Sequence, residues 1–154
     1  MANPQNQTPT IRNKRAGFEY ELLEKFSAGI MLLGSEIKSI RDGKVNMGDA
    51  FCYFRKGELY VRHLSISEYS KGTHYNHDPL RERKLLLNKR ELKKLLSKTK
   101  ERGFTIIPVS IFFNERGIAK MEIALAKGKK LHDKRDSIRN KDSKRDIDRA
   151  MKGD

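Results

Sequence analysis

The amino-acid sequence predicts a mainly β fold with helices, in which short strands close into a small barrel. Runs of alternating apolar and polar residues separated by turn residues support the strands, and few segments have helical periodicity. In addition, residues 127–154 contain 11 Lys or Arg and 6 Asp but almost no apolar residues. We therefore expect a disordered leader at 1–12, a folded region at 13–130 and a basic C-terminal tail at 131–154.

The periodicity of the first patterned segment, residues 18–33, is ambiguous. Phe18, Tyr20 and Leu22 alternate as in a strand, whereas apolar residues within 22–26 also fit one face of a helix. Gly29 favours the strand, with a bulge or bend at the glycine.

A short helix is expected next. Ser35 would be its N-cap, Ile37 and Ile40 would be buried, and Gly43 would end it. Strands at 51–55 and 59–64 then form a hairpin across residues 56–58. Residues 66–83 have no periodicity, and loops of that length are usually functional or disordered.

The most clearly specified helix begins at Asn88, because Glu91 follows three residues later in the capping-box arrangement. Gly103 is expected to supply the left-handed residue at its end. The buried stripe of this helix consists of Leu92, Leu95 and Leu96.

The last two strands, at 104–113 and 118–127, are expected to pair across a turn that contains Gly117. Met121, Ile123 and Leu125 alternate with other residues, which indicates one buried face. Pro108 cannot donate to a sheet and therefore indicates an edge or a bulge. Five or six strands in so short a chain favour an OB-type closed β-barrel with about three flanking helices.

The charge balance predicts the kind of partner. The chain has 34 Lys or Arg against 20 Asp or Glu, a formal net charge of +14. An excess of cations favours binding to phosphates, because each neutralised phosphate releases counterions. We therefore expect nucleic acid as the partner, with acidic membrane lipid as the weaker alternative. A single cysteine, the lack of a signal peptide and the lack of a long apolar run predict a soluble cytoplasmic protein without a membrane partner.

The tail has too few apolar residues to bury, so we expect it to be disordered when free. If residues 134–152 were helical, four cations would share one sector, at steps of three and four residues. These cations are Lys141, Arg145, Arg149 and Lys152. A channel lined with phosphates would offset the cost of ordering such a helix.

Three clusters of polar and cationic residues predict an RNA surface on the folded region, although each cluster alone also fits a solvated face. They comprise Asn13, Lys14 and Arg15, then Glu36, Lys38 and Arg41 in the short helix, and Arg81, Arg83 and Lys84 after the long loop. A carboxylate in the first turn of a helix usually complements the helix dipole, but Glu36 can also accept from base or sugar donors.

Catalytic and metal-binding patterns are weak. The spacing of His74 and His77, with Asp78 next to the second histidine, suggests metal ligands, but a third and a fourth ligand are not evident beside the two histidines, so a polar loop is favoured. Gly128-Lys129-Lys130 lacks the glycine spacing of a phosphate-binding loop. Cys52 alternates within a strand and is interpreted as a small buried residue. We expect no enzyme activity, no cofactor and no metal.

Four motifs in order resemble the SsrA-binding protein (small protein B, SmpB) family of bacterial trans-translation: NKRAGFEY, GSEIKSIRDGKVN, DPLRERKLLLNKREL and AKGKKLHDKR. The resemblance covers about residues 11–152. It implies an OB-type barrel that binds the tRNA-like domain of transfer-messenger RNA (tmRNA), as a monomer in complex with that RNA. It also implies delivery to stalled ribosomes, where the tail would enter the small-subunit decoding centre and the empty mRNA channel as a helix.

By this resemblance, Asn13–Arg15 and the cluster around Glu36 lie on or beside the RNA-binding face. The segment that joins the barrel to the tail matches the family at Gly128, Lys129, Lys130, His132, Asp133, Lys134 and Arg135. Many members carry a histidine where this chain has Phe18, so the role of that histidine is not transferred.

Two other readings remain open. A ribosomal or ribosome-assembly protein would also combine a basic barrel with disordered arms. A metal-dependent nuclease would require clustered carboxylates, whereas the acidic residues here are scattered among cations.

Overall fold

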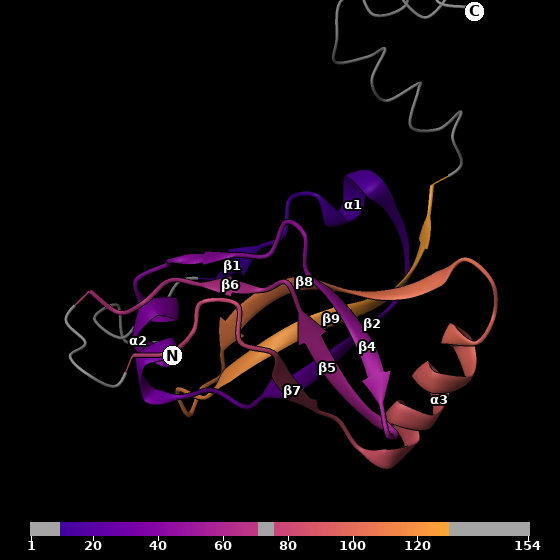
Figure 1. The fold of residues 1–154 in the computed structure, drawn as a ribbon. Coiled ribbons are helices and arrows are strands. Elements are labelled where there is room, and N and C mark those ends of the chain that lie inside the picture. The colour runs from indigo at the N-terminus through magenta and orange to yellow at the C-terminus, as the bar shows by residue number, and fades with distance from the viewer. Residues whose placement is uncertain (1–9, 71–75, 130–154) are drawn as a thin grey trace, which may run out of the picture.

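The computed structural model describes residues 10–70 and 76–129, and its strands are arranged around a common core (Figure 1). The strands of the main sheet are β1 (Ile11–Arg12), β2 (Tyr20–Ile30), β4 (Phe51–Arg55), β5 (Glu58–Arg62), β7 (Arg83–Leu86), β8 (Phe104–Phe113) and β9 (Ala119–Gly128). Their order is β1-β8-β4-β5-β7-β2-β9, and β8 also pairs with β9. The pairings from β8 round to β9 therefore close into a ring, which confirms the predicted closed arrangement.

The remaining elements flank this ring. β3 (Val45–Asn46) and β6 (Ser65–Ile66) form a separate two-stranded sheet. The helices are α1 (Ala16–Glu19), α2 (Gly34–Arg41) and α3 (Lys89–Thr99), so the expectation of about three flanking helices is confirmed within the described residues.

The boundary predicted between leader and barrel is too late. Ile11 and Arg12, assigned to the leader, form β1 and pair with Ile111 and Ser110 of β8. Two residues carry no readable periodicity, and their extended conformation depends on the edge that β8 offers. The rest of the leader and the tail at 131–154 lie outside the described residues.

β2 resolves the ambiguity of residues 18–33 in favour of a strand. It runs antiparallel to β9, and its register shifts between Leu22 and Glu24. The irregularity is thus not at Gly29, which pairs normally with Lys120 and Leu86. An added Cβ at Gly29 would lie 3.3 Å from the Cβ of Leu86, so this glycine permits close packing of β2 on β7.

α2 begins two residues earlier than predicted, with Leu33 rather than Ser35 as its N-cap. The Glu36 carboxylate accepts a hydrogen bond from the Leu33 N–H. The Ser35 side chain does not cap the helix and instead contacts His77. Ile40 is fully buried, and Ile37 is only half-buried. Gly43, with φ of 74°, follows the helix as predicted.

The predicted β4–β5 hairpin is confirmed, with a tighter turn than expected. Arg55 pairs with Glu58, and the two residues between them, Lys56 and Gly57, both have positive φ. This is the backbone conformation of a two-residue hairpin turn that matches strand twist. β7 was missed, because it begins at the last residue of a long stretch without periodicity and has only four residues.

α3 confirms the capping box. The Glu91 N–H donates to Asn88 Oδ1 at 2.8 Å, and the Asn88 N–H donates to Glu91 Oε1 at 3.3 Å. The helix ends at Thr99, so Gly103 (φ 89°) lies in the following turn and is not the residue next to the cap. Of the three predicted leucines, Leu95 is fully buried.

β8 and β9 pair as predicted, and the register shift between Pro108 and Ser110 confirms the bulge. Their inward residues join those of the other strands in the core. Its fully buried members include Ile40, Leu59, Val61, Ile66, Leu95, Ile111, Met121 and Ile123. Ala124 and Ala126 are buried as well, so β9 is covered on both faces over part of its length.

Candidate nucleic-acid interface

A buried ion-pair network joins α2 to β7. Arg83 Nε donates to Glu36 Oε2 at 2.6 Å, and Arg81, through its Nη2, donates to Glu36 Oε1 at 2.6 Å. The Leu33 N–H donates to the same Oε1 at 2.7 Å. Arg83 also donates to the carbonyl of Leu64 at 2.6 Å. Both Glu36 oxygens are therefore occupied from within the protein.

The electrostatics of this network favour the charged state of Glu36. Burial alone would raise the pKa of the carboxyl, but the hydrogen bonds from Arg81 and Leu33 and the charge of Arg83 outweigh it, so the pKa is lowered. The side chains of Glu36 and Arg83 are each 0% exposed. A fully buried and fully paired group cannot accept from a base or contact a phosphate, so the prediction that Glu36 and Arg83 are RNA ligands is corrected to a structural role.

His77 extends the same interior. Its side chain is 4% exposed, with Nδ1 2.8 Å from Ser35 Oγ and Nε2 2.8 Å from the carbonyl oxygen of Ile66. Because a carbonyl only accepts, Nε2 carries the proton and Nδ1 accepts from the serine. His77 thus connects α2 to β6 in the interior and is not exposed to solvent. His74 lies outside the described residues.

Asn13 anchors the N-terminal segment to the bulge of β8. Its backbone N–H donates to the Val109 carbonyl at 2.8 Å, and its Nδ2 donates to the Pro108 carbonyl, also at 2.8 Å. Its Oδ1 accepts from the Arg15 N–H at 3.2 Å. The side chain predicted to contact RNA therefore already holds the local fold.

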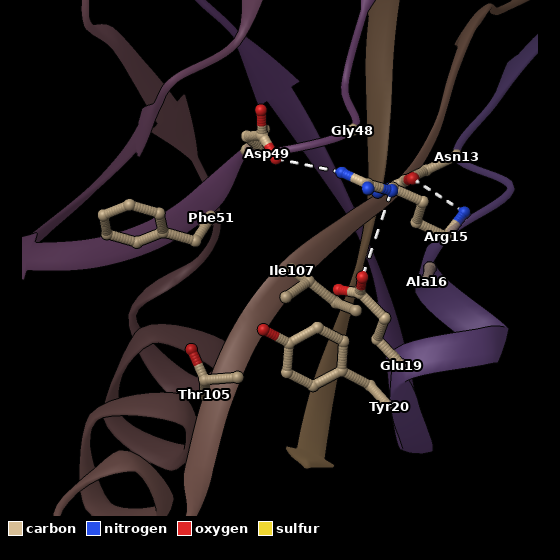
Figure 2. A pocket seen from close by; sticks show the side chains of 11 residues that line it. Asn13, Arg15, Ala16, Glu19, Tyr20, Gly48, Asp49, Phe51, Thr105 and Ile107 are labelled. Carbon is tan, nitrogen blue, oxygen red and sulfur yellow. Dashed lines mark hydrogen bonds and ion pairs between the residues drawn. The ribbon is translucent and has the colours of Figure 1, made fainter. Parts of the chain in front are cut away.

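Arg15 lies over a small polar pocket of about 240 Å³ (Figure 2). Its Nη1 is 3.0 Å from Asp49 Oδ1, and its Nε is 3.9 Å from Glu19 Oε1. Tyr20 and Ile107 contribute the apolar side of the pocket. Two carboxylates lie beside one guanidinium here, so the charge of Arg15 is partly compensated, and its role as an RNA contact stays a prediction.

Lys14 instead borders a larger groove of about 700 Å³ on the outer side of β1, β2, β8 and β9. Arg12 and Lys25 line the same groove, together with half-buried Phe112 and Phe113. We call this surface the cationic groove. Its full lining is Thr10, Arg12, Asn13, Lys14, Lys25, Val109, Ser110, Phe112, Phe113 and Glu122.

The cations of this groove are only partly neutralised. Lys25 Nζ is 3.6 Å from Glu122 Oε1, but neither Arg12 nor Lys14 has a carboxylate within ion-pair distance in the described part of the chain. The guanidinium carbon of Arg41 lies 5.5 Å from the centre of the Phe113 ring, which places a further cation at its border. Unpaired cations beside aromatic rings can bind a phosphate backbone and its bases together.

Among the residues of the groove and its border, Asn13, Lys14 and Arg41 were predicted from the sequence. Arg12, Lys25, Phe112 and Phe113 were not. Arg12 could have been recognised from the sequence, because it is close to the cations Lys14 and Arg15, but it was assigned to the leader. Lys25 is far from that run in sequence, and only the pairing of β2 with β9, and of β9 with β8, brings it to the groove.

The other predicted contact residues are scattered. Lys38 Nζ lies 5.4 Å from the centre of the Tyr69 ring, and Lys84 is paired with Glu58 on β5. At the end of β9, Gly128 pairs with Tyr20, and the Lys129 N–H donates to the Glu19 carbonyl at 3.2 Å. Lys130, His132, Asp133, Lys134, Arg135 and the tail cations Lys141, Arg145, Arg149 and Lys152 lie outside the described residues.

Other kinds of site find little support. Residues 10–70 and 76–129 contain no group of three His, Cys, Asp or Glu arranged to hold a metal. Cys52 is buried in β4, and burial raises the pKa of its thiol far above the ordinary value, as expected of a packing residue. Among the described helices, none has the length and apolar character needed to cross a membrane.

Comparisons with known proteins agree with the resemblance inferred from the motifs. The family model described as SmpB protein matches residues 10–153. The SsrA-binding protein of Cytophaga hutchinsonii is 58% identical over 139 residues, which are 90% of this chain and 91% of the relative. That of Bacteroides thetaiotaomicron is 56% identical over 142 residues, 92% and 95% of the two chains.

A solved structure is also similar. A chain of "tmRNA-SmpB: a journey to the center of the bacterial ribosome" superposes with a TM-score of 0.72 at 47% identity, covering 86% of this chain and 96% of that chain. Identity at this level over nearly the whole length, with a matching fold and an ordered set of motifs, leads to one conclusion. The chain belongs to the SmpB family.

Proposed function

We propose that this chain binds tmRNA, the SsrA RNA, through its tRNA-like domain and delivers it to stalled ribosomes for trans-translation. The role is one of binding rather than catalysis. The ribosome is the second partner. Because bacterial ribosomes are in the cytoplasm, we place the protein there as well. Both partners correspond to what the relatives are described as binding or assembling with.

The observation that carries the proposal is the cationic groove. Arg12 and Lys14 lie there without carboxylate partners in the described residues, next to Phe112 and Phe113. A folded RNA presents phosphates at fixed positions, and a groove held by strands can match them. The groove is therefore the part of the barrel that we assign to the tRNA-like domain.

We assign the tail a different task. Its cations are proposed to follow the empty mRNA channel of a stalled ribosome from the decoding centre, with Lys141, Arg145, Arg149 and Lys152 on one side of a helix. Tail and barrel would then act in sequence, since the barrel carries the RNA and the tail recognises the vacant channel.

The direct test is to sequence the RNA that co-purifies with the protein from its own cells. The proposal requires one abundant tmRNA in wild type and its loss when Arg12 and Lys14 are both replaced by Ala. Lys94→Ala with Lys98→Ala, on exposed α3, is the matched control for charge. Bulk ribosomal RNA without tmRNA would favour a ribosomal or ribosome-assembly protein and overturn the proposal.

A further inference from the structure

The outer face of the β4–β5 hairpin carries an unusual set of side chains. Phe51, Tyr53 and Arg55 alternate along β4, and Tyr60 and Arg62 alternate along β5, while the residues between them face the core. The register places Phe51 opposite Arg62 and Tyr53 opposite Tyr60. We call these five residues the aromatic ladder.

The rings of the ladder contact one another without being buried. The ring centres of Phe51 and Tyr53 are 6.2 Å apart, as are those of Tyr53 and Tyr60. All three rings are half-buried. Within the described residues neither tyrosine hydroxyl donates or accepts a hydrogen bond.

Two arginines lie over these rings. The guanidinium carbon of Arg55 is 4.3 Å from the centre of the Tyr60 ring, and that of Arg62 is 5.9 Å from the centre of the Tyr53 ring. Arg55 also forms an ion pair with Glu82, with 3.4 Å between Arg55 Nη1 and Glu82 Oε1. Arg62 is exposed and has no carboxylate partner in the described part of the chain, so its charge remains available.

The end of the ladder has a backbone feature of its own. His63, directly after β5, has φ of 60°, a conformation that few residues other than glycine adopt. Its ring is nevertheless stacked on Phe51, with ring centres 5.5 Å apart and planes inclined by 26°. The strained residue thus adds another ring to the same exposed face.

We infer that the aromatic ladder is a second RNA-binding surface, which takes unpaired nucleobases by stacking and their phosphates at Arg62. Every base has an aromatic face, and half-buried surface rings interleaved with arginine suit single-stranded RNA irrespective of sequence. Cross-strand aromatic pairs also stabilise a sheet, but that role gives no reason for an unpaired exposed guanidinium. An RNA duplex keeps its bases stacked and paired, so it offers no free base faces to these rings.

The ladder and the cationic groove are lined by different residues. The ladder lies on β4 and β5, whereas the groove is lined from β1, β2, β8 and β9, of which β8 pairs with β4. In Figure 1, β4 and β5 lie in front of β2 and β9. The two surfaces share no residue, so each can be changed by substitution without altering the lining of the other.

The test uses the full chain with two probes, a short fluorescein-labelled oligouridylate and a blunt-ended RNA duplex of equal length. Tyr53→Val with Tyr60→Val removes two rings but keeps strand-forming residues. Oligouridylate binding should weaken by about tenfold or more, while duplex binding remains unchanged. Tyr69→Val, which removes a half-buried ring outside the ladder, is the control and should leave both affinities unchanged. Unchanged oligouridylate binding in the double variant, or an equal loss for both probes, overturns the inference.

Two further measurements do not depend on the stability of the double variant. Arg62→Lys keeps the charge but loses the planar group and should weaken oligouridylate binding, whereas Arg102→Lys, at an exposed position outside the ladder, should not. On the wild-type protein, 4-thiouridine in the oligouridylate should crosslink to residues 51–63. Crosslinks confined to other segments would overturn the inference.

The experiments can contradict the inference about the aromatic ladder without contradicting the proposed function, and the reverse. Loss of tmRNA in the Arg12 and Lys14 variant tests the groove and does not involve the ladder. Retention of tmRNA by a ladder variant leaves the proposed function intact whatever happens to oligouridylate binding.

Discussion

Glu36 of α2 and Arg83 of β7 are joined in the interior by an Nε–Oε2 hydrogen bond of 2.6 Å, although 47 residues separate them in the chain. Both side chains are fully buried. Arg83 also reaches the Leu64 carbonyl, so the pair ties α2, β7 and the end of the β5–β6 connection into one unit. The network therefore fixes α2, which carries Arg41 to the border of the cationic groove.

Replacing Glu36 by Gln should destabilise the protein by about 3 kcal/mol or more, because Arg83 would remain buried without its counter-charge. Urea unfolding followed by far-UV circular dichroism measures this change. The control is Glu101→Gln, which removes an exposed ion pair with Lys98 and should cost less than about 1 kcal/mol. Equal effects of the two substitutions would contradict the structural role of Glu36.

The contribution of Glu36 should also depend on pH. Its pKa is lowered from the ordinary 4.5 in the folded protein, so its charged form stabilises the fold fully above 4.5 and loses this effect as pH falls through the folded pKa. The difference in free energy of unfolding between wild type and Glu36→Gln should be constant near neutral pH and shrink in acid. A difference that grows in acid would contradict the sign of the shift.

Lys14 and Arg15 are neighbours in sequence but should behave differently in RNA binding. Lys14→Ala should flatten the dependence of log affinity on log salt by about 0.7–0.9, the value expected for one lost phosphate contact. Arg15→Ala should have a much smaller effect on this slope, because Asp49 and Glu19 already compensate its charge. Titrations of the tRNA-like domain at several salt concentrations measure both slopes. Equal slopes for the two variants would contradict the assignment of Lys14 to the RNA surface.

The tail prediction concerns Arg145. Proline there would cost about 3 kcal/mol in a helix interior and almost nothing in an unfolded chain. Arg145→Pro should therefore leave binding to free tmRNA unchanged but strongly reduce tagging of peptides on stalled ribosomes in a reconstituted translation system. Arg145→Lys should retain most of the tagging. Full tagging by the proline variant would mean that the tail acts as an extended polycation.

The sequence by itself determined the features that depend on near neighbours. The capping box between Asn88 and Glu91 closes over three residues, and the turns at Gly57 and Gly117 need only a backbone that tolerates positive φ. The bulge at Pro108 follows from a missing donor. The charge of +14 likewise indicated a polyanionic partner without any knowledge of the fold.

The tertiary structure alone decided which charges are available to that partner. Glu36, Lys14, Arg15 and Arg83 all read as polar surface residues in the sequence, yet two of them are buried together and a third is paired with Asp49. Lys25 reaches the groove only through the pairing of β2 with β9. Pairing and burial of a charge depend on residues that are distant along the chain, so local pattern could not separate an interior ion pair from an RNA contact.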